Sequence, residues 1–124
     1  MTTKLILQKA AAARKFAAML SENDKNKALL AISDRLNSTT THIIYQNKQD
    51  IERSRSTMSD VMIDRLMLSE ERIRAMAKGV RDVAALPDPV GEIIESFTRP
   101  DGLKISKVRV PLGVIAIIYE SRPN

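Results

Sequence analysis

A continuous apolar run near the end of the sequence constrains the fold more than any other feature. Residues 114–118 read Val-Ile-Ala-Ile-Ile, with no polar residue among them. A strand with one solvated face alternates apolar and polar residues, so this run predicts a strand that is buried on both faces. Such a strand is typical of a parallel sheet covered by helices, and parallel neighbours require long crossover connections. The sequence offers no parallel partner strand, which predicts an interrupted α/β fold.

The first two thirds of the sequence predict a series of helices. Apolar residues recur at helical spacing, and Ser69 followed by two glutamates is a strong helix start. In the second predicted helix the apolar stripe is formed by Leu29, Ile32 and Leu36. Ser59 is expected to cap a short helix. Apart from this short helix, the predicted helical segments are residues 5–20, 22–36, 43–51 and 69–86.

A β-hairpin is predicted after the helices. Ile93, Ile94 and Phe97 lie in a short β-prone run, and residues 103–110 are rich in β-branched residues. Between them, Arg-Pro-Asp-Gly at residues 99–102 predicts a turn, because proline presets φ and glycine accepts a positive φ. A two-stranded ribbon is weak alone, so this hairpin is expected to be solvated or to pair with another surface.

Composition excludes several classes of function. The sequence has no cysteine and one histidine, His42, which excludes disulfides and a thiol nucleophile within these residues and argues against a metal centre. No stretch approaches the length of a membrane helix. The net charge of +5 is split between the two ends, and residues 37–96 carry eight bases against ten acids. This distribution argues against nucleic-acid binding, because the sequence has no run of four or more adjacent bases and no interleaved aromatic residues.

The C-terminal motif resembles one known enzyme family. Residues 110–124 read Val-Pro-Leu-Gly-Val-Ile-Ala-Ile-Ile-Tyr-Glu-Ser-Arg-Pro-Asn, which closely resembles the segment that opens the cofactor-binding domain of γ-glutamyl phosphate reductases. The resemblance extends upstream through residues 47–50, 62–66 and 86–91. The wider aldehyde dehydrogenase superfamily shares the Pro-x-Gly-Val start but usually continues with Pro-Trp-Asn. Arg-Pro-Asn in its place resembles the reductase branch.

The resemblance implies a reaction and a cofactor. Such enzymes reduce L-glutamate 5-phosphate to glutamate 5-semialdehyde with NADP(H), in the second step of proline synthesis from glutamate. A cysteine thiolate performs the attack in this family, and that cysteine lies beyond residue 124. The 124-residue chain alone is therefore expected to be inactive. The family also implies a small-molecule substrate, a homo-oligomer when full-length, a cytoplasmic location, and no nucleic-acid, membrane or metal partner.

Five residues at the end of the motif are candidate site residues by this resemblance. Asn124 is the candidate donor to the oxygen that becomes negative during thiol attack, and an ordinary turn asparagine is the alternative. Arg122 is the candidate for binding a phosphate of the substrate, with a solvated loop arginine as its alternative. The three candidates for cofactor contact are Tyr119, Glu120 and Ser121, at the carboxyl end of the predicted strand.

The fold class implied by the resemblance is α/β, truncated from the aldehyde dehydrogenase fold. Residues 1–90 are expected to be the helical N-terminal part of the cofactor domain, and residues 91–110 the hairpin of an oligomerisation element. Residues 111–124 are expected to hold the first strand of a parallel, Rossmann-like sheet, left incomplete.

Three alternatives stay open. The chain could be an inactive fragment, which predicts poor solubility because residues 114–118 lack sheet partners. It could be an interaction module that docks onto a complementary C-terminal piece, which predicts activity only in the mixture. A basic, helical nucleic-acid-binding domain would instead show salt-sensitive affinity for DNA or RNA.

Overall fold

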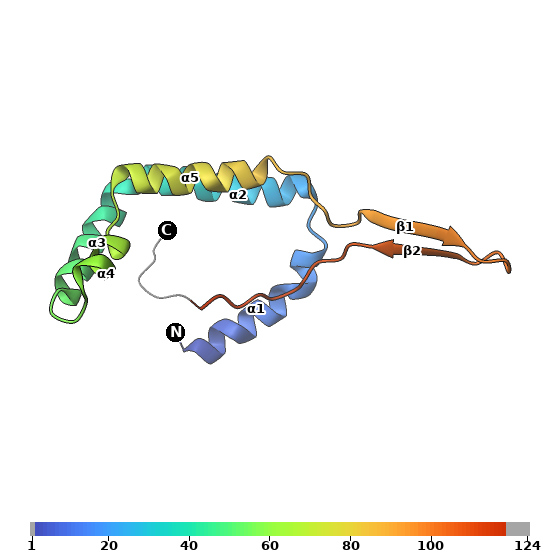
Figure 1. Ribbon diagram of the computed structural model, residues 1–124, viewed down its shortest axis with the longest axis horizontal. Coiled ribbons are helices and arrows are strands. Elements are labelled where there is room, and N and C mark those ends of the chain that lie inside the picture. Colours follow the sequence, from blue (N-terminus) through green and yellow to red (C-terminus); the bar gives the residue numbers. More distant parts are fainter. Residues whose placement is uncertain (1, 119–124) are drawn as a thin grey trace. The chain divides into compact units, whose positions relative to one another are not determined.

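The computed structural model describes residues 2–118, which fall into two compact units (Figure 1). One unit comprises residues 2–22 and 87–116, and the other comprises residues 23–86 together with 117–118. Five helices and one antiparallel hairpin make up the secondary structure of the described residues. The predicted α/β class, with N-terminal helices followed by a hairpin, is confirmed.

Four helices build the unit of residues 23–86. They are α2 (Glu22–Ser38), α3 (Thr40–Ser54), α4 (Asp60–Leu66) and α5 (Glu70–Ala84). The predicted cap of α5 is present, since the Ser69 hydroxyl accepts a hydrogen bond from the Arg72 backbone N–H at 3.1 Å. Glu70 and Glu71 lie in the first turn, where their negative charges interact favourably with the positive end of the helix dipole. The sequence pattern therefore determined where α5 begins.

The apolar core of this unit is small. Within residues 2–118, Ile73 and Ala77 on α5 are the buried apolar residues, at 0% and 1% exposure. The partner face on α2 is formed around Ser33, which is fully buried and donates a hydrogen bond to the Ala77 carbonyl at 2.8 Å. The prediction that Ile32 continues the packed stripe of α2 was wrong, because Ile32 is 51% exposed. A small hydroxyl at position 33 lets the two helices approach and bond directly.

Asn47 connects α3 to the link between α4 and α5. Its side chain is 6% exposed and forms two hydrogen bonds with backbone groups. The amide nitrogen donates to the Leu66 carbonyl at 2.9 Å, and the amide oxygen accepts from the Leu68 N–H at 2.7 Å. These backbone groups lie where α4 has ended, so no helical partner is available to them there. Asn47 thereby fixes the turn from which α5 begins.

Arg72 reinforces the same turn from α5. Its guanidinium donates to the Met67 carbonyl at 2.7 Å and to the Asp64 backbone carbonyl, and it pairs with the Asp64 carboxylate at 3.2 Å. Because the pair is partly exposed, its Coulomb contribution is small, and the bonds to backbone carbonyls matter more for the geometry.

Helix α1 (Thr3–Ala18) begins the other unit. Thr2 caps it by accepting a hydrogen bond from the Leu5 N–H at 3.4 Å. None of its residues is buried within the described chain; Phe16 is 67% exposed, and Met19, directly after the helix, is 79% exposed. Helix propensity and capping therefore form α1 without burying its apolar residues.

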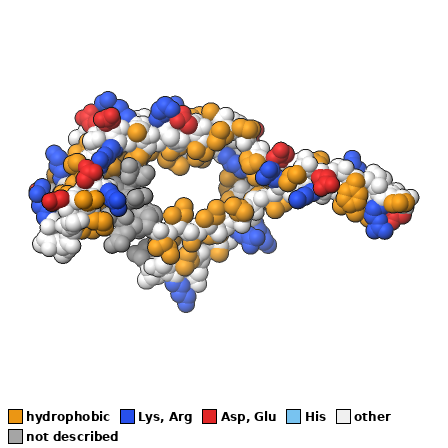
Figure 2. All heavy atoms as spheres, in the orientation of Figure 1, with side chains coloured by type: hydrophobic (Ala, Val, Ile, Leu, Met, Phe, Trp, Pro, Cys, Tyr) orange, Lys and Arg blue, Asp and Glu red, His pale blue; other side chains and the backbone are white. Residues whose placement is uncertain are grey.

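Strands β1 (Ile93–Thr98) and β2 (Lys104–Val108) form the predicted hairpin. Phe97 pairs with Ile105, Ser96 pairs with Ser106, and the register shifts near Ile94. The turn closes as expected, with Gly102 at φ +85° donating its N–H to the Arg99 carbonyl at 2.9 Å. Every residue of both strands is exposed (Figure 2). The two strands of the hairpin pair with each other, but neither face of the hairpin is covered.

The predicted strand at residues 114–118 is not formed. Residues 109–118 are extended chain without assigned strand pairing, and the described residues contain one sheet, of strands β1 and β2. A strand exists only where a neighbour accepts its backbone hydrogen bonds, and the described residues supply no parallel neighbour. The Rossmann-like strand therefore stays a prediction. No helix within residues 2–118 has the length and apolar character needed to span a membrane.

Candidate functional site

The five site residues predicted from the sequence lie outside the described residues. They are Tyr119, Glu120, Ser121, Arg122 and Asn124. The described chain positions the segment that leads to them. Residues 111–115 lie beside α1, and a mostly apolar cavity of about 440 Å³ lies between them. On the side of α1 its lining includes Ala10, Ala13 and Ala17. The predicted site residues therefore follow a segment that packs on small side chains of α1.

Gly113 is essential to this packing. Its φ of +96° lies where residues with a side chain are rarely found, and a Cβ added there would lie 3.1 Å from Arg14 Nε. Glycine thus permits both the backbone conformation and the close approach of the Arg14 guanidinium. The Pro-Leu-Gly motif, identified in the sequence as the start of the strand segment, has a local structural reason in its glycine.

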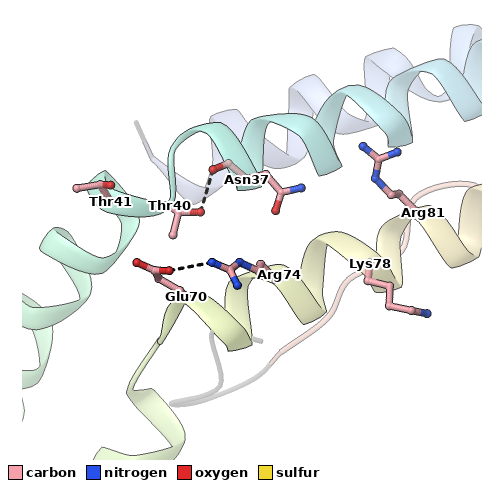
Figure 3. Close-up of a pocket in the computed structure, with 7 residues that line it drawn as sticks. All are labelled: Asn37, Thr40, Thr41, Glu70, Arg74, Lys78 and Arg81. Atoms are coloured by element: carbon pink, nitrogen blue, oxygen red, sulfur yellow. Dashed lines mark hydrogen bonds and ion pairs between the residues drawn. The ribbon is translucent and has the colours of Figure 1, made fainter.

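A second, polar cavity of about 520 Å³ lies between α5 and the junction of α2 with α3 (Figure 3). Its side chains come from Asn37, Thr40 and Thr41 on one side and from α5 on the other. The Thr40 hydroxyl donates to the Asn37 carbonyl at 2.9 Å, so that hydroxyl is engaged locally. The α5 residues that line the cavity are Glu70, Arg74, Lys78 and Arg81.

Carboxylates neutralise the three cations of this cavity. Arg74 pairs with Glu70 at 2.9 Å, Lys78 pairs with Asp82 at 2.6 Å, and Arg81 pairs with Asp34. The cavity therefore offers a balanced set of charges, without a nucleophile or a histidine. Within the described part of the chain, no group of three His, Cys, Asp or Glu residues could hold a metal ion. Two of these ion pairs lie within α5, and the Arg81–Asp34 pair joins α5 to α2.

Sequence reasoning missed the residues that hold α2 against α5. Ser33 donates to the Ala77 carbonyl and accepts from Arg81 Nε at 3.0 Å, and Arg81 also reaches Asp34. A signal was present, because Ser33 is four residues after Leu29 and three before Leu36 and so shares their helical face. A serine on an otherwise apolar face is the pattern that predicts an interhelical hydrogen bond.

Known proteins match this chain over nearly all of its length. It is 51% identical over 113 residues to γ-glutamyl phosphate reductase of Halalkalibacterium halodurans, a match that covers 90% of this chain and 27% of the relative. It is also 51% identical over 122 residues to γ-glutamyl phosphate reductase of Neisseria meningitidis serogroup C, covering 98% of this chain and 29% of the relative. No protein-family model matches the chain.

Solved structures give the same result. The crystal structure of γ-glutamyl phosphate reductase from Thermotoga maritima aligns with a TM-score of 0.80 and 37% identity, covering 84% of this chain and 25% of that one. The enzyme of the same name from Saccharomyces cerevisiae aligns with a TM-score of 0.80 and 29% identity, over 90% of this chain and 29% of that one.

Sequence and structure agree that the chain is similar to one part of the γ-glutamyl phosphate reductases, as the resemblance in the sequence implied. The chain spans little more than a quarter of the length of the relatives it matches.

Proposed function

We propose that this chain is the N-terminal part of an enzyme that reduces L-glutamate 5-phosphate to L-glutamate 5-semialdehyde. The observation that supports the proposal is 51% identity, over 113 and 122 residues, with two proteins named γ-glutamyl phosphate reductase. NADPH supplies the hydride in this reaction, and phosphate is released. The reaction belongs to the synthesis of proline from glutamate, which implies a cytoplasmic enzyme.

The chemistry requires groups that these 124 residues do not contain. A thiolate is a suitable nucleophile for an acyl phosphate, because it attacks well near neutral pH and leaves readily afterwards. The chain has no cysteine, so the nucleophile must come from the part of the enzyme that the chain does not span. We therefore assign to this chain a supporting role, and activity to the complete polypeptide or to a complemented pair.

Within the complete enzyme, the end of this chain would contribute to the site. The Asn124 side-chain amide would donate to the oxygen that gains negative charge as the thiolate attacks, and Arg122 would bind a phosphate of the substrate. Residues 119–121 would lie near the cofactor, at the carboxyl end of a strand at 114–118 that forms when its sheet neighbours are present. Residues 1–90 would form the helical N-terminal part of the cofactor domain, and the hairpin of residues 91–110 would contribute to oligomerisation.

Replacing Asn124 tests its proposed role. A chimera joins this chain, at residue 124, to the part of the N. meningitidis reductase that the chain does not match. We expect Asn124→Ala to lower kcat by about 10²–10³-fold, the effect typical of removing one oxyanion donor. We expect Asn124→Asp to lower it at least as much, because a carboxylate cannot donate to the oxyanion. The measurement is NADPH formation from glutamate semialdehyde, NADP and phosphate.

The exposed Asn23→Ala variant is the matched control and should keep full kcat. A kcat within twofold of the parent chimera for Asn124→Ala would make this residue an ordinary turn asparagine. The reductase function itself would still stand in that case, because it rests on the activity of the parent chimera.

A further inference from the structure

Helix α5 is only partly covered along the apolar face that its sequence predicts. Ile73 and Ala77 are buried, whereas Met76 and Val80 are half-buried and Val83 is 54% exposed. The exposed part of the face opens into a groove of about 610 Å³ between α2 and α5. The residues that line the groove are Leu29, Leu36, Arg72, Ala75, Met76, Gly79, Val80 and Val83.

Gly79 leaves open space in the α2–α5 groove where another residue would place a side chain. This glycine lies in the middle of α5, and a Cβ added to it would meet nothing within 4 Å. Glycine in a helix interior is unfavourable relative to alanine or leucine. No atom of the described chain fills the space beside Gly79, so the glycine destabilises α5 without allowing any close contact within the described chain. A surface that packs closely onto the groove would use that space.

The relatives indicate what that surface is. More than two thirds of the length of each matched reductase lies outside the match with this chain. At the same time, the described chain leaves many large apolar side chains exposed and buries two apolar residues in all. An aliphatic groove exposed on a segment that represents a quarter of a larger enzyme is best explained as a contact with the rest of that enzyme.

We propose that the α2–α5 groove seats an aliphatic surface of the part of the reductase that this chain does not span, with Gly79 as the point of closest approach. The inference rests on the proposed function, in that it takes the remainder of a γ-glutamyl phosphate reductase as the occupant. Leu29, Leu36, Val80 and Val83 supply the apolar contact. Gly79 admits the opposing surface because it lacks a side chain.

Substituting Gly79 in the chimera gives a test that depends on the sign of the change in Tm. With the groove open, Gly79→Ala and Gly79→Leu should raise the Tm of the full-length chimera by about 1 °C, because both residues favour a helix more than glycine does. With the groove filled, we expect Gly79→Leu to lower Tm by at least that amount, because its side chain collides with the packed surface. The control is Lys78→Leu, whose side chain lines the polar cavity on the other side of α5 and should leave Tm nearly unchanged.

A second measurement covers the case in which Gly79→Leu prevents folding of the chimera. The tagged 124-residue chain is co-expressed with the separate remainder of the N. meningitidis reductase, and the amount recovered with the tag is measured. We expect Gly79→Leu to reduce recovery at least tenfold and Lys78→Leu to leave it unchanged.

A raised Tm for Gly79→Leu in the chimera, or unchanged recovery, would overturn the proposal. A third result would also overturn it: the lone chain forms a dimer in sedimentation, Gly79→Leu abolishes that dimer, and the same substitution raises the Tm of the chimera. The groove would then seat a second copy of this chain. These outcomes are independent of catalysis. A parent chimera that folds without reductase activity would contradict the proposed function. The change in Tm caused by Gly79→Leu would still test the groove in that chimera, because Tm does not depend on catalysis.

Discussion

Asn47→Leu should destabilise the unit of residues 23–86 by about 3 kcal/mol, because two partly buried backbone groups would lose their partner. The Asn47 amide bonds the Leu66 carbonyl and the Leu68 N–H at 2.9 and 2.7 Å, and the side chain is nearly enclosed. Leucine has a similar size but can neither donate nor accept. The two backbone groups would then remain without hydrogen bonds in a site that water does not readily reach.

Urea unfolding of the chain, followed by helical circular dichroism, measures this effect as a change in the free energy of unfolding. Gln46→Leu is the matched control, because it makes the same kind of replacement at the exposed neighbouring position of α3. The control should change the free energy of unfolding by less than about 0.5 kcal/mol, as most surface substitutions do. Equal effects for the two variants would show that Asn47 does not hold the α4–α5 turn.

Ser33→Leu should have an effect of similar size, on the order of 3 kcal/mol, by forcing α2 away from α5. Ser33 is fully buried and lies within hydrogen-bond distance of both the Ala77 carbonyl and Arg81 Nε. A leucine side chain does not fit into that space and removes both hydrogen bonds. Overpacking and the loss of bonding therefore act in the same direction.

The control for this variant is Ser38→Leu, at the exposed end of the same helix. Thermal unfolding of the two variants separates the effect of the α2–α5 contact from that of leucine in α2 generally. A Tm for Ser33→Leu equal to that of Ser38→Leu would mean that the Ser33 contact contributes nothing to stability.

The sequence was sufficient to predict the elements that depend on local signals. Ser69 and the two glutamates after it set the start of α5, and the Pro-Asp-Gly turn closes the hairpin where expected. Local capping and turn chemistry act within a few residues, so these signals do not depend on the rest of the protein.

Predictions that depend on distant partners could not be made in the same way. The helical period gave the buried face of α2 but not which of Ile32 and Ser33 turns toward α5, because that choice depends on the carbonyl of Ala77, 44 residues away. Residues 114–118 have the composition of a buried strand, yet they remain unpaired in the described chain, since a strand requires a neighbour.

The candidate site was predicted through the family resemblance alone. Asn124 and Arg122 have no local pattern that specifies a role, and the roles proposed for them involve a thiol and a cofactor outside these 124 residues. By contrast, the polar cavity between α5 and the α2–α3 junction was not predicted, because the Arg81–Asp34 ion pair beside it joins two helices that lie far apart in the sequence.

Complementation tests the central claim most directly. The 124-residue chain, the remainder of the N. meningitidis reductase and the two co-expressed together are each assayed for phosphate-dependent reduction of NADP by glutamate semialdehyde. We predict activity in the co-expressed pair and none in either piece alone, because the nucleophile belongs to one piece and the N-terminal support to the other. Full activity of the remainder alone, or an inactive pair that forms a stable complex, would contradict the account.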